Sequence, residues 1–217
     1  MSTAIEARIP LWFKLAYTAF CAVLVPTYLI AYGPTNFLYF CDVALLTGLA
    51  AIWLENPLLA SAPAVGILLP QALWAVDFVG AAAGMPLTGM TAYMFDAKLP
   101  LFTRGLSFFH FWLPFVLAWL VWRLGYDRRA FAVWTVAAWL LLSICYFLMP
   151  GPPAPNPNLP VNINYVFGLS DAAAQNFMPG PLWFAMLLIG LPAIIFYPTH
   201  RLLLRLAGTA PAETVGA

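Results

Sequence analysis

The chain has 217 residues, of which nine are Lys or Arg and eight are Asp or Glu, so only 8% are charged whereas 64% are hydrophobic. A soluble domain is typically about 25% charged. This composition excludes an ordinary soluble protein, a disordered chain and a nucleic-acid-binding protein, which would need a basic surface. It predicts an all-α polytopic membrane protein that forms a single transmembrane domain over residues 1–217.

Six apolar runs approach the length of about 20 residues that a membrane-spanning helix needs. In chain order they cover residues 10–31, 36–54, 57–83, 105–124, 130–149 and 181–204. We expect each run to be a helix, because lipid offers no partners to the backbone and a helix satisfies its own. The predicted fold is therefore a bundle of six transmembrane helices.

The cations segregate to the two sides that six spans define. Seven lie on the side of both termini, and only two lie on the opposite side: Arg8, Lys14, Arg123, Arg128, Arg129, Arg201 and Arg205 against Lys98 and Arg104. Because cytoplasmic segments carry the excess of Lys and Arg, both termini are predicted to be cytoplasmic. The expected location is a cell membrane, with the cytoplasmic membrane of a bacterium as the specific prediction.

Two long loops lie on the outer side, at residues 84–104 and 150–180. The second begins with a proline-rich run that favours extended backbone. Its later part, residues 162–168, alternates amides with apolar residues. That pattern is typical of a segment folded back over a bundle, and a plain linker is the alternative interpretation.

Three titratable side chains lie well inside the spans, namely Asp42, Asp77 and His110. At 1.5 Å per residue, each lies roughly 7–9 Å below the outer boundary. Cys41 and Cys145 share that layer. Because ionisable groups inside a membrane are costly and usually functional, their common depth predicts a site.

Each of these residues also has a structural interpretation. Asp42 lies near the start of its helix and could interact with the partial positive charge of the helix N-terminus. Asp77 could extend to the surface or pair with Arg104. His110 could be a hydrogen-bonded core residue.

A thiol and an imidazole at matching depth suffice for nucleophilic acyl chemistry, in which the His removes the thiol proton and a carboxylate orients the His. Cys41 and His110 are the candidate pair, and Asp42 or Asp77 is the candidate orienting group. Polar residues at the outer rim are the candidate substrate-binding groups: Asn36, Asn162, Asn164 and Tyr165. No spacing of His and acidic residues supports a metal site, so neither a metal nor a cofactor is expected.

Four short motifs occur in order along the chain. They are Tyr-Phe-Cys-Asp-Val-Ala-Leu at 39–45, Ser-Phe-Phe-His-Phe-Trp-Leu-Pro at 107–114, Asn-Tyr-Val-Phe at 164–167 and Pro-Leu-Trp-Phe at 181–184. Their order and spacing resemble the YwaF-type integral membrane family, whose eukaryotic relatives include proposed phospholipid acyltransferases. The chain is also distantly similar to the androgen-induced, FAR-17a-type lipid hydrolases.

This resemblance covers the second to the last span. It implies that Cys41 is a nucleophile and that His110 is its base. The family often has a His two residues before the Cys-Asp pair, where this chain has Tyr39.

Three functions follow as hypotheses. The first is a lipid acyltransferase or hydrolase that uses a Cys–His pair near the outer leaflet. The second is a non-catalytic membrane subunit or scaffold. The third is a proton or cation transporter that uses the intramembrane Asp and His residues. Membrane lipids are the expected partners, nucleic acid is not one, and homo- or hetero-oligomers in the membrane are compatible with all three.

Overall fold

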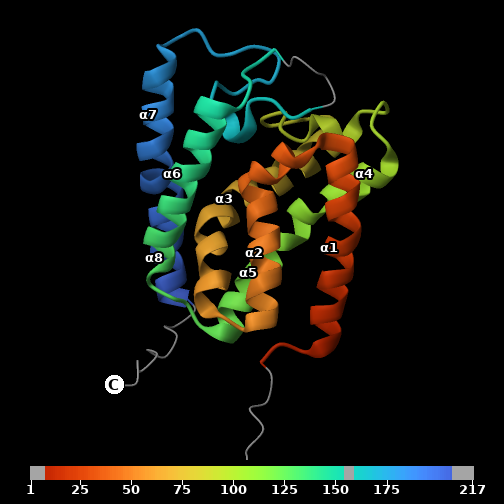
Figure 1. The fold of residues 1–217 in the computed structure, drawn as a ribbon, viewed down its shortest axis with the longest axis vertical. Coiled ribbons are helices and arrows are strands. Elements are labelled where there is room, and N and C mark those ends of the chain that lie inside the picture. Colours follow the sequence, from red (N-terminus) through yellow and green to blue (C-terminus); the bar gives the residue numbers. More distant parts are fainter. Residues whose placement is uncertain (1–7, 154–158, 207–217) are drawn as a thin grey trace, which may run out of the picture.

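The computed structural model describes residues 8–153 and 159–206, and within these ranges it contains helices and loops but no strand. Five helical stretches are long and apolar enough to cross a membrane, and a sixth apolar helix is shorter. They pack side by side in one bundle (Figure 1). The predicted all-α polytopic membrane fold is confirmed.

The first two crossings are α1 (Leu11–Tyr32) and α2 (Phe40–Leu54), joined by the short helix η1 (Pro34–Leu38). The predicted span at residues 36–54 is therefore wrong at its start, because the extended backbone of Tyr39 (φ −62°, ψ 137°) separates η1 from α2. With 15 residues, α2 is about 22 Å long. It is shorter than the hydrocarbon core of about 30 Å, so α2 alone does not span it.

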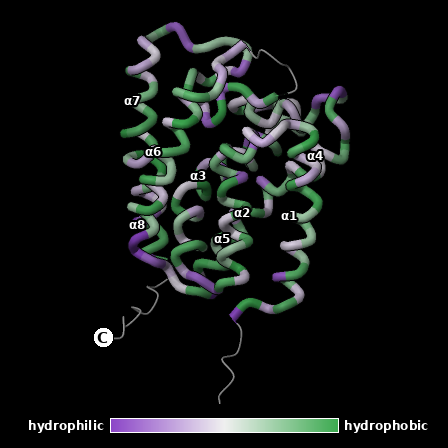
Figure 2. The backbone as a smooth tube through the Cα atoms, in the orientation of Figure 1, coloured by the Kyte–Doolittle hydropathy of each residue, from purple (hydrophilic) through white to green (hydrophobic). Residues whose placement is uncertain are grey.

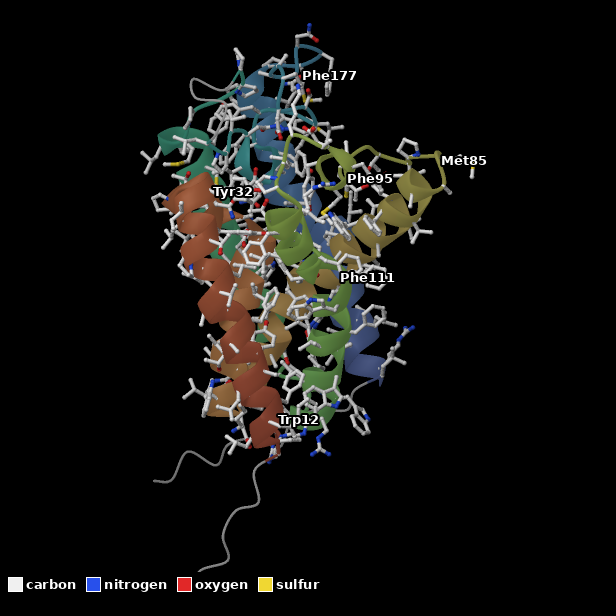
Figure 3. All side chains as sticks on the ribbon, turned by 90° about the vertical axis from the view of Figure 1, so that its right-hand side faces the viewer. Trp12, Tyr32, Met85, Phe95, Phe111 and Phe177 are labelled. Atoms are coloured by element: carbon white, nitrogen blue, oxygen red, sulfur yellow. The ribbon has the colours of Figure 1, made fainter. Side chains whose placement is uncertain are left out.

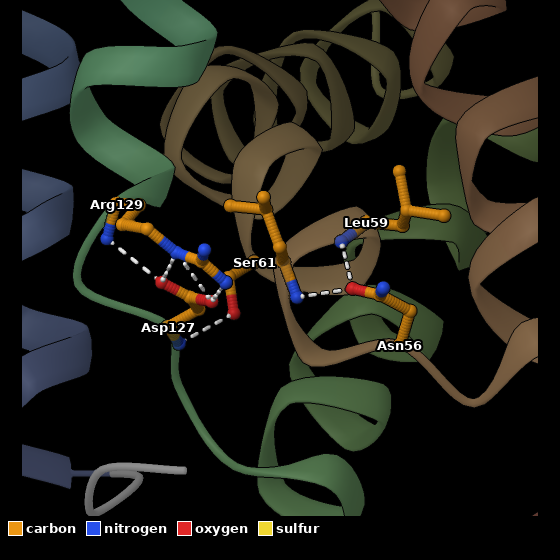
Figure 4. Close-up of polar contacts among 6 residues, drawn as sticks. Asn56, Leu59, Ser61, Asp127 and Arg129 are labelled. Atoms are coloured by element: carbon orange, nitrogen blue, oxygen red, sulfur yellow. Dashed lines mark hydrogen bonds and ion pairs between the residues drawn. The ribbon is translucent and has the colours of Figure 1, made fainter. Parts of the chain in front are cut away.

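The third crossing, α3 (Pro57–Ala82), occupies the centre of the bundle and packs against α2, the fifth helix and the sixth. Asn56 caps its start by accepting hydrogen bonds from the backbone N–H groups of Leu58 and Leu59 (Figure 4). Residues 60–67, in the half of α3 nearer its start, are buried on every face. In its outer half only one face is buried.

The remaining crossings are α5 (Phe109–Leu124) with the short α4 (Leu101–Ser107) before it, α6 (Ala130–Leu148), and a last stretch of three segments. That stretch consists of α7 (Gly180–Gly190), the π-helical segment η4 (Leu191–Phe196) and α8 (Tyr197–Leu206). The fourth crossing begins at Leu101, four residues before the predicted span, with a local break at Phe108.

The start of α1 and the end of α8 lie at the same end of the bundle, as six crossings require (Figure 1). Hydrophilic residues gather at the ends and loops of the bundle, and hydrophobic ones along the helices (Figure 2). Trp12 lies at the end opposite to Met85 and Phe177 (Figure 3).

The end with the expected cytoplasmic cations contains both ion pairs found in the described ranges. Lys14 Nζ lies 2.8 Å from Glu55 Oε1, and Arg129 lies 2.8 Å from Asp127. The backbone N–H of Asp127 also donates to Ser61 on α3 (Figure 4). These contacts tie the turns between α2 and α3 and between α5 and α6 to the bundle.

The outer loops are folded onto the helices. Val161, Asn162, Ile163 and Val166 are all buried, and a second apolar cluster forms where this loop meets α6 and α7. The folded-back interpretation therefore holds for this part of the 150–180 loop, and the plain-linker interpretation is wrong for it. Residues 154–158 of the proline-rich run lie outside the described residues.

Candidate active site in the outer half of the bundle

Cys41 and Asp42 lie in the first turn of α2. The Cys41 thiol approaches Asp42 Oδ2 at 3.8 Å, and the Asn36 amide donates to the same oxygen at 3.3 Å. Asp42 is only 3% exposed, and its other oxygen, Oδ1, has no hydrogen-bond partner in the protein. The carboxylate thus receives two hydrogen bonds and has a free acceptor.

Asp42 also lacks a counter-ion, because no cation of the described residues forms an ion pair with it. Its hydrogen bonds come from the Cys41 thiol and the Asn36 amide, not from the backbone N–H groups at the start of α2. A buried carboxylate without a cation is costly unless a proton or a donor group neutralises it. The environment of Asp42 therefore favours a proton or a ligand that donates hydrogen bonds.

The first turn of α2 also contributes its positive end to the site. The first N–H groups of a helix have no acceptor within the helix, and together they favour negative charge nearby. Cys41 is the second residue of α2. The helix end favours negative charge at Cys41, whereas burial and the neighbouring Asp42 carboxylate oppose a standing thiolate, so the thiol must lose its proton to a base when it reacts.

His110 lies in the first turn of α5, and its Nδ1 is 2.7 Å from the backbone carbonyl oxygen of Ser107. Because a carbonyl oxygen only accepts, Nδ1 carries the proton, and Nε2 is the free acceptor. The imidazole stacks on Trp74, with ring centroids 5.3 Å apart. This is the tautomer that a general base needs.

The structure does not bring His110 into contact with Cys41. In the described part of the chain, His110 forms no hydrogen bond or ion pair with Cys41, Asp42 or Asp77. The predicted Cys–His pair therefore shares one half of the bundle without a direct contact. Asp42, not His110, is the group that touches the thiol.

Tyr93 is on the short helix η2 (Ala92–Phe95) of the first outer loop. Burial raises the pKa of the Tyr93 hydroxyl, the nearby Cys41 raises it further, and the adjacent Trp74 and Ser107 lower it. Although Tyr93 neighbours Trp74, the buried Trp74 Nε1 has no partner that meets hydrogen-bond criteria. Tyr28 completes the cluster, with its hydroxyl 2.6 Å from Ser107 Oγ.

Asp77 has a structural role. Its two oxygens accept five hydrogen bonds from the first outer loop, from the backbone N–H groups of Leu87, Thr88, Gly89 and Thr91 and from the Thr91 hydroxyl. All of its capacity is therefore used to hold that loop.

The alternative prediction that Asp77 pairs with Arg104 is wrong. Arg104 donates to the backbone carbonyls of Leu99 and Met94 instead. The positions of these residues along the sequence do not show that the first outer loop turns back onto the Asp77 carboxylate.

The predicted rim residues differ in what they contact. Asn164 accepts from the backbone N–H of Phe40 and donates to the Leu38 carbonyl, so it holds the start of α2. Asn162 instead bonds within its own loop, to Phe167 and Gly168. Asn36 alone among the four contacts Asp42.

Tyr165 is 40% exposed, and its backbone carbonyl accepts from the Trp183 indole. Asn162, Asn164 and Tyr165 all have positive φ values, of 53°, 58° and 61°. Such left-handed backbone is unfavourable for a non-glycine residue and is common near functional sites. The loop that carries the predicted rim residues is thus held in a specific, strained shape beside α2.

Sequence reasoning did not single out Tyr28, Trp74 and Tyr93 of this cluster, or the buried Gln71 on α3. Aromatic residues are abundant throughout the chain, and a Gln or Tyr has no motif of its own, so no sequence signal separated them from the packing residues. No group of three or more His, Cys, Asp or Glu side chains that could hold a metal ion occurs among the described residues.

Comparison with protein-family models, with curated proteins and with solved structures finds no match for this chain. The family resemblance therefore stays a prediction, and the functional argument rests on the site itself.

Proposed function

We propose that this multi-pass membrane protein transfers the acyl group of a lipid ester, with Cys41 as the nucleophile. The observation that carries the proposal is the contact between the Cys41 thiol and the buried Asp42 carboxylate, at the positive end of α2. Asp42 is positioned to accept the thiol proton during the reaction, and the start of α2 favours the negative charge that then develops.

In the first half of the reaction, Asp42 accepts the thiol proton and the Cys41 sulfur attacks the ester carbonyl. A carbon–sulfur bond forms, the ester carbon–oxygen bond breaks, and the leaving alkoxide takes the proton from Asp42. The Phe40 N–H donates to Asn164, so we assign stabilisation of the oxyanion of the tetrahedral intermediate to the next N–H groups of the first turn, those of Cys41 and Asp42.

In the second half, a hydroxyl group attacks the thioester: a carbon–oxygen bond forms, the carbon–sulfur bond breaks, and the proton lost by the hydroxyl ends on the Cys41 sulfur, which restores the thiol. Water as the attacking group gives a hydrolase, and a lysolipid gives an acyltransferase. His110 presents Nε2 as an acceptor in the same half of the bundle, and we assign to it the removal of the proton from that hydroxyl.

The substrate is a membrane lipid that enters from the outer leaflet. The site lies in the half of the bundle remote from the seven cations. Because an excess of cations marks the cytoplasmic side, that half faces the outer leaflet. The same rule places both ends of the chain in the cytoplasm of the cell.

One observation favours a second candidate, proton or cation transport. Asp42 is buried, has a free oxygen and has no counter-ion, which are features of residues that bind a proton or cation inside a membrane. Transport would require Asp42 but not the thiol of Cys41.

Turnover of a labelled lipid ester, either a phospholipid or a monoacylglycerol, by the purified protein in liposomes tests the proposal. Cys41→Ala and Asp42→Asn should abolish release of the labelled acyl group, and His110→Gln should slow it by about 100-fold or more. Cys21→Ala is the matched control, because Cys21 is a buried thiol on α1 outside the site.

Equal turnover by the wild-type protein and Cys41→Ala would contradict acyl transfer through Cys41. A proton or cation flux that is lost in Asp42→Asn but kept in Cys41→Ala would select the transport function.

A further inference from the structure

Five buried side-chain atoms of the described residues have no hydrogen-bond partner in the protein, and four of them lie on α2 and the outer half of α3. These four are Asp42 Oδ1, Gln71 Nε2, Gln71 Oε1 and Trp74 Nε1, and the fifth is Trp134 Nε1 on α6. Gln71 is 3% exposed and Trp74 is 5% exposed. Since buried polar atoms are nearly always paired, such a group of unpaired atoms needs an explanation.

Gln71 and Trp74 are three residues apart and thus share one face of α3, the buried face of its outer half. Asp42 comes from α2, which packs antiparallel against α3. Counted from the turn that joins the two helices, Asp42 lies about 18 Å, Gln71 about 21 Å and Trp74 about 26 Å along the bundle. Because α2 and α3 are packed neighbours, the three side chains lie within about 8 Å of one another in depth.

The unpaired nitrogen of Trp134 has a different cause. A Cβ atom added to Gly66 would meet Trp134 Nε1 at 1.7 Å, so the indole lies directly against the glycine backbone. No ligand fits between them. Packing alone therefore explains why the Trp134 indole nitrogen is unpaired. A substitution at Trp134 is accordingly the matched control for a substitution at Trp74.

The unpaired atoms define the chemistry of a complementary ligand. The Trp74 N–H only donates and requires an acceptor, whereas the Asp42 carboxylate accepts and requires a donor. The Gln71 amide offers one group of each kind. An anionic head group is disfavoured, because it would face the Asp42 carboxylate.

We infer that Asp42, Gln71 and Trp74 bind the neutral glycerol ester of a lipid that has a free hydroxyl group, as in a monoacylglycerol. The ligand hydroxyl donates to Asp42 Oδ1, the ester carbonyl accepts from Trp74, and Gln71 bonds to both parts. The inference names the substrate class of the proposed acyl transfer and rests on that function for its catalytic meaning, but binding itself does not depend on Cys41 chemistry.

Binding can be measured by the ligand-induced shift in melting temperature of the full-length protein in detergent. The probe is 1-monooleoylglycerol, and the matched ligand is 1-O-oleyl-2,3-di-O-methylglycerol, which lacks both the hydroxyl donor and the carbonyl acceptor. The monooleoylglycerol should stabilise the wild-type protein and the ether should not.

Gln71→Leu separates a binding role from a packing role. Without ligand, this variant should melt about 2 °C or more above the wild type, because an apolar side chain replaces an unpaired amide. It should nevertheless bind monooleoylglycerol at least tenfold more weakly. Trp74→Phe should also weaken binding, and the control Trp134→Phe should leave binding unchanged.

Equal binding of the two ligands, or unchanged affinity in Gln71→Leu, would overturn the inference and leave water as the occupant. The outcome for the proposed function is read separately, from acylation of Cys41. Lost binding in Gln71→Leu without any Cys41 acylation in the wild type would support the binding site and contradict the reaction. Cys41 acylation that is unaffected in Gln71→Leu would support the reaction and contradict the binding site.

Discussion

Asn164 Oδ1 accepts a hydrogen bond of 3.0 Å from the backbone N–H of Phe40, which precedes it by 124 positions. Phe40 is the first residue of α2 and is followed directly by Cys41. The same Asn164 side chain donates to the Leu38 carbonyl at 2.9 Å. The second outer loop thus fixes the point at which α2 begins, and with it the position of the candidate nucleophile.

Asn164→Ala should destabilise the protein by about 1–3 kcal/mol, because it leaves the Phe40 N–H and the Leu38 carbonyl without partners in a largely buried place. Asn164→Asp should cost less, since it keeps an acceptor for Phe40. Thermal unfolding in detergent, compared at one detergent concentration, measures both variants. Equal loss in the two variants would contradict a capping role for the side-chain oxygen.

Asp77→Ala should release the first outer loop, because it removes the acceptor of five hydrogen bonds at once. Hydrogen exchange of the amides at residues 87–91 should accelerate, with a loss of about 2–4 kcal/mol in stability. Asp96→Ala is the matched control in the same loop, where the carboxylate accepts only from the Lys98 N–H. Unchanged exchange at residues 87–91 in Asp77→Ala would refute the anchoring role.

Stability should fall in acid through Glu55. Burial raises the pKa of Glu55, but hydrogen bonds from Lys14 and from the backbone N–H groups of Arg8 and Ile9 outweigh it, so the pKa lies below its ordinary value of 4.5. Because the folded-state pKa is depressed, this stabilisation is present above about pH 4.5 and is lost as pH falls through the folded pKa.

Glu55→Gln should therefore cost about 1 kcal/mol at pH 7 and should flatten the decline in melting temperature between pH 5 and pH 3. A residual slope should remain, because the hydrogen bond from Arg129 lowers the pKa of Asp127 as well. An identical pH dependence in the wild type and the variant would exclude this contribution.

Opposite ends of the bundle should face opposite sides of the membrane. Lys98 and Arg128 are both exposed, in the first outer loop and in the turn before α6. In intact cells, a membrane-impermeant thiol reagent should label Lys98→Cys and not Arg128→Cys, and permeabilisation should make both reactive. Labelling of Arg128→Cys alone would invert the assigned orientation.

The helical crossings could be predicted from the sequence because long apolar runs leave the backbone no alternative to helix in a membrane. The prediction for α2 was wrong by four residues, since the break at Tyr39 depends on a single extended residue in an apolar run. The common depth of the polar groups was predictable from helical rise, which places residues along the bundle but not around each helix axis.

Partners across the bundle could not be predicted for the same reason. Depth alone made Asp77 equivalent to Asp42, yet a loop returns to saturate Asp77 while Asp42 keeps a free oxygen. Gln71 was hidden because its significance lies in the absence of a protein partner, which only packing reveals. The sequence predicted that Cys41 pairs with His110, whereas in the structure the Cys41 thiol contacts the Asp42 carboxylate.

The central claim is that Cys41 forms an acyl thioester with a membrane lipid ester, and trapping that intermediate tests it most directly. The purified wild-type protein is incubated in liposomes with a monoacylglycerol or, in a parallel sample, a phospholipid, each with an alkyne-tagged acyl chain, then quenched in acid and digested for peptide mass spectrometry. We predict the tagged acyl group on Cys41, its removal by neutral hydroxylamine and its absence from Cys41→Ala, with Cys21→Ala labelled as the wild type. Folded protein without acyl label on Cys41, or with equal label in Cys41→Ala, would contradict the account.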